Sequence, residues 1–168
     1  MTLKPMRLIA PLSLLALVAC SQPPSTTPVA GAPSCKPTNA ALNAAGTAAT
    51  NRARSAAGLP QVRANTLLAQ VAADHACDMA RRGQMTHRGS STSGPAERVK
   101  ARGYDTRITA ENIAAGPFDT RRVLSEWQKS PGHRANILLP QVDEFGIGRA
   151  VSADGRTQYW AAVYAAEK

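Results

Sequence analysis

The feature that most constrains this chain is the uneven distribution of its aromatic residues. The first half is rich in alanine, so its helices carry small side chains and can pack closely on another layer. The second half holds the aromatic and strand-like segments. This division predicts an α+β fold, a mixed helix–sheet sandwich around one core. All seven aromatic residues lie in the second half, at Tyr104, Phe118, Trp127, Phe145, Tyr159, Trp160 and Tyr164.

Capping and breaking residues predict four helices. Asn65 is suited to cap the second helix and Gly83 to end it, while the Ser130–Gly132 break ends the fourth. On the second helix His75 falls on the apolar face, where we expect it to be a hydrogen-bonded packing residue. The predicted helices cover residues 37–57, 65–82, 95–102 and 120–129.

Three segments read as strands: residues 108–114, 145–151 and 157–164. Asp154-Gly155 lies between the last two, and this pair is typical of a tight hairpin turn. We therefore expect the last two strands to be antiparallel neighbours.

The N-terminal residues are typical of an export signal. Lys4 and Arg7 precede the short apolar run Leu8–Val18, which is too short to span a membrane. The run ends in Leu17-Val18-Ala19-Cys20, which resembles the lipobox of bacterial lipoproteins. We expect residues 1–19 to be a lipoprotein signal peptide and Cys20 to be lipidated. An ordinary signal peptide with an accidental cysteine is the alternative.

Residues 20–34 hold the lipidated cysteine and a tether with four prolines, which cannot form a core. The folded domain is expected over residues 35–168. Ser21, rather than aspartate, follows Cys20, which predicts sorting to the outer membrane, facing the periplasm or the cell surface.

After lipidation of Cys20 an even pair of cysteines remains, Cys35 and Cys77. Export permits a disulfide between them, which would pin the start of the domain to the second helix. Two free buried thiols are the alternative.

Loss of residues 1–19 leaves 18 basic and 11 acidic residues, a net charge of +7. A basic exported domain favours anionic partners, such as lipid phosphates or cell-wall carboxylates. A solvated basic surface without a partner explains the charge equally well. No nucleic-acid motif is present, and we expect a monomer.

Three separate segments supply the groups for a polar or metal-binding cleft. They are Met85-Thr86-His87, Ala110-Glu111-Asn112-Ile113 and the segment after Ser130 that contains His133. Two imidazoles and one carboxylate can coordinate Zn²⁺ or another divalent cation. The same groups could instead form a buried structural cluster.

In their order and spacing, these motifs resemble the CAP superfamily, also called SCP-like, in its bacterial secreted branch. The resemblance covers roughly residues 38–165 and implies an α-β-α sandwich with a central antiparallel sheet. The motifs that carry it are His75–Ala80, Met85–His87, Arg98–Tyr104, Ala110–Ala114, Trp127, Ser130–Leu138, Gly146–Gly148 and Tyr159-Trp160.

The resemblance also implies a set of site residues. His87, Glu111 and His133 match three of the four cleft residues of the wider family, some members of which bind a divalent metal. Ser130 stands where eukaryotic members have a second glutamate. Asn136 stands where they have a glutamine, and it is expected to line the cleft.

The function expected from this pattern is an envelope-anchored module that binds a lipid, a cell-wall fragment or a metal ion, without established catalysis. One alternative is a metal-dependent, peptidase-like hydrolase acting on peptide or envelope polymer. Another is an adhesion or scaffold protein with a vestigial cleft. No persuasive nucleophile accompanies the histidines.

Overall fold

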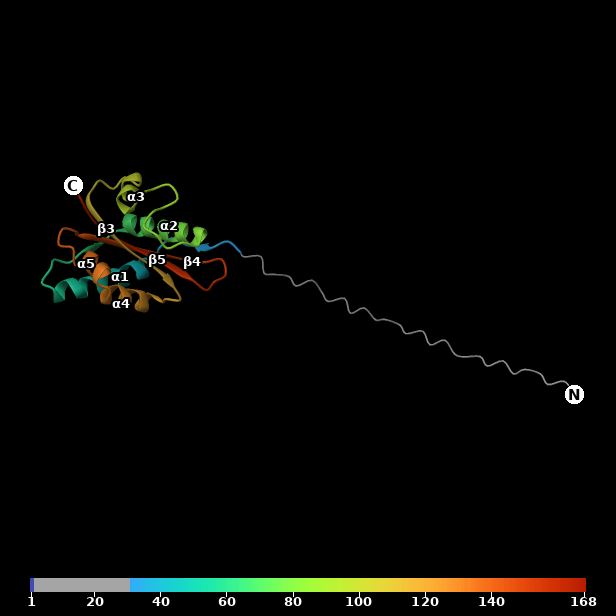
Figure 1. Ribbon diagram of the computed structural model, residues 1–168. Coiled ribbons are helices and arrows are strands. Elements are labelled where there is room, and N and C mark those ends of the chain that lie inside the picture. Colours follow the sequence, from blue (N-terminus) through green and yellow to red (C-terminus); the bar gives the residue numbers. More distant parts are fainter. Residues whose placement is uncertain (2–30) are drawn as a thin grey trace.

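The computed structural model describes residue 1 and residues 31–168 (Figure 1). The predicted lipidation at Cys20, nearly all of the predicted signal peptide and most of the tether fall on residues 2–30, outside the described residues. No helix of the described part is long and apolar enough to cross a membrane.

One five-stranded sheet forms the centre of the domain. Three long strands run antiparallel as neighbours in the order β4, β5, β3. Two short strands, β1 and β2, both pair with β4, and only β2 does so in parallel. The bounds are β1 Ser34–Cys35, β2 Arg63–Ala64, β3 Thr106–Gly116, β4 Glu144–Val151 and β5 Gln158–Glu167.

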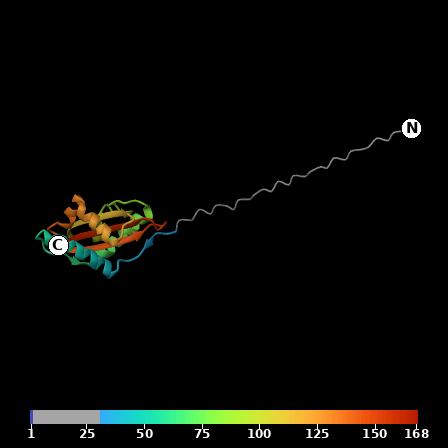
Figure 2. The same cartoon turned by 90° about the horizontal axis from the view of Figure 1, so that it is seen from below.

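Helices cover both faces of this sheet (Figures 1 and 2). Helices α1, α4 and α5 form one layer, and α2 and α3 form the other. The predicted α-β-α sandwich with its central antiparallel sheet is thus confirmed. The helix bounds are α1 Ala40–Ala56, α2 Thr66–Arg82, α3 Pro95–Ala101, α4 Thr120–Lys129 and α5 Pro131–Ile137.

The capping residues explain where the first two helices begin and end. The side chain of Asn39 accepts a hydrogen bond from the Leu42 amide at 2.8 Å, so α1 begins at Ala40 rather than at Pro37. Asn65 caps α2 in the same way, as predicted. Gly83 ends α2 in a left-handed conformation with φ 64°, which glycine adopts without steric strain.

The predicted break at Ser130-Pro131-Gly132 both ends α4 and starts a further helix. Ser130 is the last cap of α4 and the first cap of α5, and Pro131 occupies the first helical turn. Proline is tolerated there because the first turn needs no amide donor. His133 and Asn136 therefore lie on a helix that the sequence analysis did not anticipate.

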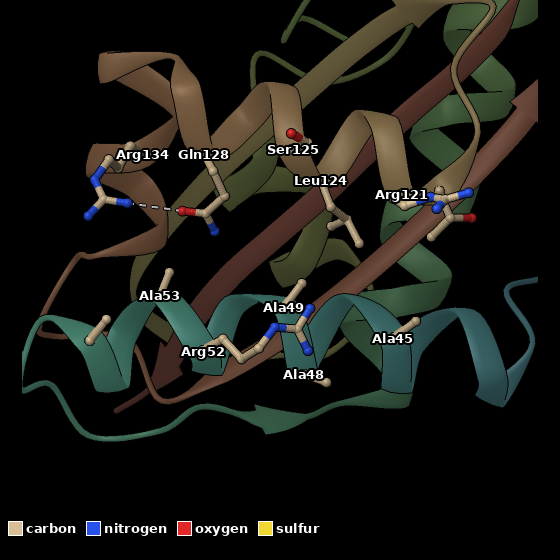
Figure 3. Close-up of a pocket in the computed structure, with 12 residues that line it drawn as sticks. Ala45, Ala48, Ala49, Arg52, Ala53, Arg121, Leu124, Ser125, Gln128 and Arg134 are labelled. Carbon is tan, nitrogen blue, oxygen red and sulfur yellow. Dashed lines mark hydrogen bonds between the residues drawn. The ribbon is translucent and has the colours of Figure 1, made fainter.

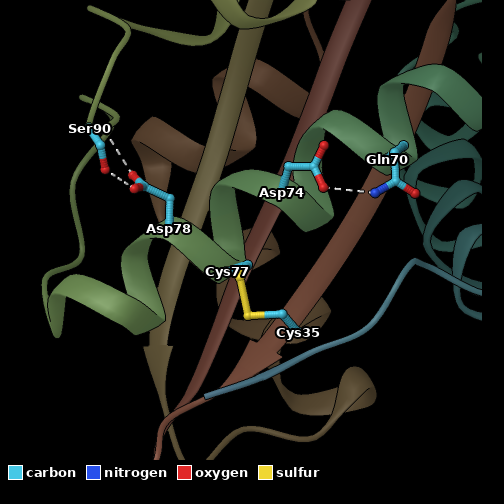
Figure 4. Close-up of a disulfide and its surroundings, with 6 residues drawn as sticks. All are labelled: Cys35, Gln70, Asp74, Cys77, Asp78 and Ser90. Atoms are coloured by element: carbon cyan, nitrogen blue, oxygen red, sulfur yellow. Dashed lines mark hydrogen bonds between the residues drawn. A yellow bond between two sulfur atoms is a disulfide. The ribbon is translucent and has the colours of Figure 1, made fainter. Parts of the chain in front are cut away.

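The predicted disulfide is confirmed between Cys35 and Cys77, with an S–S distance of 2.05 Å (Figure 4). It joins β1 to α2. A covalent link between residues 42 positions apart removes loop entropy from the unfolded chain, which contributes roughly 4 kcal/mol at most.

A fully buried arginine holds the end of α1. Arg54 is 0% exposed, and its guanidinium donates to four backbone carbonyls at 2.7–3.1 Å. One of the four acceptors is the carbonyl of Ile137, at the end of α5, so Arg54 fastens α1 to α5. The four acceptors belong to Pro60, Ile137, Leu139 and Val142.

Helix α2 lies directly on the backbone of β4, and two glycines permit the approach. A Cβ atom at Gly146 would stand 2.1 Å from the Ala69 nitrogen, and one at Gly148 would stand 2.2 Å from the Ala73 nitrogen. These neighbours are backbone atoms of a helix and cannot rotate away. Any side chain at either position would separate the helix from the sheet.

We therefore predict that Gly148→Ala lowers the free energy of unfolding by about 3 kcal/mol, at the upper end of the usual effect of overpacking. Gly132→Ala is the matched control, because its Cβ would meet nothing within 4 Å and would lie on a helix. The control should leave stability unchanged or raise it. Urea unfolding measures both, and equal midpoints for the two variants would contradict the prediction.

Candidate functional site

Adjacent residues of β3 send polar side chains to opposite faces of the sheet, because side chains alternate along a strand. Glu111 is buried toward the α2–α3 layer, where it contacts Arg98 and His75. Asn112, 0% exposed, is buried toward the α4–α5 layer, where its amide donates to the Tyr164 hydroxyl at 3.3 Å. Because β3 is at the edge of the sheet, groups from both layers can meet beside it.

The carboxylate of Glu111 is engaged at both oxygens. Arg98 donates through Nη2 to Oε2 at 2.5 Å, and Nδ1 of His87 lies 2.8 Å from Oε1. Nε2 of His75 lies 3.8 Å from the same Oε1. Charge-assisted hydrogen bonds from the guanidinium replace the water that burial removes from this carboxylate.

The segment that carries His87 is fixed from two sides. Arg98 donates to the backbone carbonyl of His87 at 2.9 Å. Further along, Asp78 accepts hydrogen bonds from Arg82. It also accepts hydrogen bonds from Ser90 (Figure 4). Burial opposes ionisation of Asp78, but these hydrogen bonds outweigh it and lower its pKa. Asp78 therefore anchors this segment.

His133 lies near His87 on the other side of the β3 edge. Burial lowers the pKa of His133, and the neighbouring His87 imidazole lowers it further. Its ring packs at a tilt against Trp127, with 6.4 Å between centroids. Its Nδ1 atom is buried and has no hydrogen-bond partner among the described residues. Asn112 holds the His133 backbone by donating to its carbonyl at 3.1 Å.

The wet cleft expected around His87, Glu111 and His133 is not confirmed. His87 does contact Glu111, and its own side chain is 56% exposed. Glu111, in contrast, is only 4% exposed, because strand alternation turns it inward onto Arg98. The side-chain amide of Asn136 donates to the Glu111 carbonyl and so joins α5 to β3. Ser130 caps the α4–α5 junction.

A three-ligand metal centre does not fit this arrangement. Among residue 1 and residues 31–168, no group of three or more His, Cys, Asp or Glu side chains is arranged to hold a metal ion. Both oxygens of Glu111 already face Arg98 and His87. The imidazoles of His87 and His133 are the remaining donors.

His75 behaves as predicted for a packing residue. It is 1% exposed, and its Nε2 lies 3.0 Å from the Thr86 carbonyl. Burial lowers its pKa despite the nearby Glu111 carboxylate. His75 and Arg98 thus complete the surroundings of Glu111. They reach that carboxylate only in the folded chain, so the sequence alone did not mark them as site residues.

A second candidate site, which the sequence analysis did not identify, is a groove between α1 and α4 (Figure 3). Its volume is about 730 Å³. Alanines from several turns of α1 form one wall, and α4 forms the other. The groove is lined by Ala45, Ala48, Ala49, Arg52, Ala53, Ala56, Thr120, Arg121, Leu124, Ser125, Gln128 and Arg134.

The depressed pKa values of His75 and His133 predict a loss of stability in mild acid. Above about pH 6.5 both residues are neutral in the folded and the unfolded chain, so the full stability is present. As the pH falls below that value the unfolded chain takes up protons first, and stability decreases until the folded-state pKa values are passed.

Urea unfolding at pH 7.5 and pH 5.0 should therefore show a smaller free energy at the lower pH. His75→Gln should flatten this dependence, because the substitution removes one of the two groups. An identical pH dependence in the variant and the original chain would exclude His75 as a source.

Comparison with known proteins agrees with this fold. A family model described as "CAP: Cysteine-rich secretory protein family" matches residues 47–164. The uncharacterized protein YkwD of Bacillus subtilis (strain 168) is 26% identical over 109 residues, which cover 65% of this chain and 42% of that protein. The chain thus spans about two fifths of the length of this curated relative.

Solved structures of other proteins are similar as well. An outer surface protein from Borrelia burgdorferi has a TM-score of 0.69 at 19% identity, over 78% of this chain and 96% of that one. An extracellular protein containing an SCP domain from Bacillus anthracis str. Ames has a TM-score of 0.62 at 28% identity, over 71% of this chain and 38% of that one. The match to the family model covers most of the chain, which therefore belongs to the CAP, or cysteine-rich secretory protein, family.

Proposed function

We propose that this chain is an envelope-anchored binding module that holds a long-chain acyl anion in the groove between α1 and α4. The observation that carries the proposal is the composition of the groove, which combines an apolar lining with arginines that form no salt bridge with a carboxylate of the described residues. Its volume of about 730 Å³ is in the usual range for small-molecule sites.

The apolar part of the lining suits a hydrocarbon chain. Five alanines of α1 and Leu124 of α4 line the groove without bulky side chains that would divide it. An acyl chain placed there would remove apolar surface from water, which contributes about 25 cal/mol for each Å².

The charged part suits an acidic head group. Arg52, Arg121 and Arg134 line the groove, and none of the twelve lining residues is acidic. Arg121 and Arg134 lie toward opposite ends, and Arg134 donates to Gln128 at 3.1 Å (Figure 3). Guanidinium groups bind carboxylates by paired hydrogen bonds, so either end could hold the head while the tail follows the alanines.

The proposed location rests on the N-terminal sequence. Cleavage of a signal peptide after Ala19 would leave a lipidated Cys20. The lipid and the proline-rich tether would then hold the domain near the envelope, at the outer membrane or cell surface. The outer-surface and extracellular relatives support this address. Such an anchor would keep the domain beside a lipid layer, where acyl ligands are present at high local concentration.

Titration of the soluble chain with palmitate tests the groove. The chain begins at residue 20 and carries Cys20→Ser, so it keeps every described helix and strand and lacks an acyl group of its own. We expect saturable binding that Ala49→Phe abolishes, because the ring would fill the groove. Hexadecanol, which has no carboxylate, should bind at least tenfold more weakly, in line with the loss of about 1.5 kcal/mol from a charged hydrogen bond.

Ala40→Phe is the matched control, since Ala40 is exposed on α1 and does not line the groove. The control should bind palmitate like the original chain. The proposal fails if calorimetry detects no palmitate binding, or if Ala49→Phe and Ala40→Phe bind equally well.

A divalent cation at the two imidazoles is the second candidate. It is favoured by the effect of His87 on the pKa of His133 and by Nδ1 of His133, which has no hydrogen-bond partner among the described residues. Imidazole nitrogens are common ligands of Zn²⁺. Metal binding would then be reversible and weaker than at a closed four-ligand site.

Calorimetric titration with zinc tests this second candidate. His133→Ala and His87→Ala should each remove binding, whereas Asp154→Asn, at the distant β4–β5 turn, should not. Zinc binding that survives both histidine substitutions would exclude the imidazole pair.

The hydrolase and the adhesion or scaffold alternatives remain predictions. In the described part of the chain no serine or threonine hydroxyl is hydrogen-bonded to the ring of His87 or His133. The contacts that do exist fix Glu111 in place, which favours a binding role over general-base chemistry.

A further inference from the structure

Two smaller hollows continue the α1–α4 groove toward the N-terminal end of α1. The first shares Ala45 and Thr120 with the groove. The second shares Asn39, Leu42 and Arg149 with the first. Together the three hollows form a continuous path along α1, and none of their lining residues is acidic.

Five exposed cations line this path, and we call them the basic track: Lys36, Arg52, Arg121, Arg134 and Arg149. None of the five forms a salt bridge with a carboxylate of the described residues. Residues 2–30 contain no aspartate or glutamate, so that segment cannot neutralise them. The charge of the track therefore faces solvent.

The opposite helical layer is different, because several of its cations are paired. Arg82 contacts Asp78 at 2.8 Å, Arg98 contacts Glu111 at 2.5 Å, and Arg102 contacts Asp74 at 2.7 Å. Within the described residues, the positive charge that is not balanced by a salt bridge is thus greater on the α1 side. Such an asymmetry orients a protein toward an anionic surface.

We propose that the basic track docks this domain on an anionic lipid surface, with the α1–α4 groove open toward the lipid. Each basic residue close to such a surface strengthens binding about fivefold. The last hollow of the path includes Ser34 and Lys36, where the N-terminal segment enters the fold. A chain anchored through Cys20 would therefore approach the membrane with this side first.

The purpose of the docking, delivery of an acyl anion to the groove, rests on the proposed function. The docking itself needs the charges alone. Lys36 and Arg149 belong to the track but do not line the main groove. Their substitution therefore separates membrane docking from ligand binding.

Co-sedimentation with lipid vesicles tests the proposal, using the chain from residue 20 with Cys20→Ser. We expect binding to phosphatidylcholine vesicles that contain phosphatidylglycerol, weaker binding at higher salt and none to pure phosphatidylcholine. Lys36→Gln with Arg149→Gln should weaken binding about 30-fold. Palmitate affinity in solution should stay unchanged in this double variant.

The control carries Arg88→Gln and Lys100→Gln, which remove the same charge from exposed positions in the segment after α2 and on α3; neither lines a hollow with a residue of the track. It should bind vesicles nearly as well as the original chain. Lys36→Gln alone removes a side chain that forms no hydrogen bond or salt bridge within the described residues, so folding should be intact. This variant should weaken vesicle binding about fivefold.

Three outcomes would overturn the proposal. The first is equal loss of binding in the track and control variants, which would indicate net charge alone. The second is unchanged binding in the track variant. The third is binding of soluble polyphosphate through the track without any binding to vesicles, which would assign the surface to a free polyanion.

Discussion

The side-chain alternation of β3 is the constraint on which the polar chemistry of this domain depends. One step along the strand separates Glu111, which is buried against Arg98, from Asn112, which is buried against Tyr164 and holds the backbone of α5. The same strand thereby positions His87 from one layer and His133 from the other. Because β3 is an edge strand, the two imidazoles can approach each other beside it.

Local signals in the sequence were sufficient for much of the fold. Asn65 and Gly83 bounded α2, the Asp154-Gly155 turn joined β4 to β5, and the remaining cysteine pair gave the disulfide. Helix α5 was missed because Pro131 reads equally well as a helix breaker and as a first-turn residue. In that case local propensity alone does not decide the structure.

The site was harder to predict because it depends on long-range geometry. The sequence indicated His87, Glu111 and His133, but it could not show that Glu111 would be buried or that Arg98 would hold it. The α1–α4 groove has no motif at all. It arises where an alanine-rich helix meets a helix far away in the chain, and only the packing of these helices within one layer defines its volume.

The disulfide would have a mechanical consequence under the proposed anchoring of the domain at its N-terminus. Strand β1 has only two residues, so its few hydrogen bonds would yield if the preceding segment were stretched. The covalent bond from Cys35 passes such tension directly into α2, which rests on the β4 backbone. Helix α1 follows Cys35 in the chain and is thereby shielded from the pull. The groove beside it would keep its shape while the molecule is dragged or sheared.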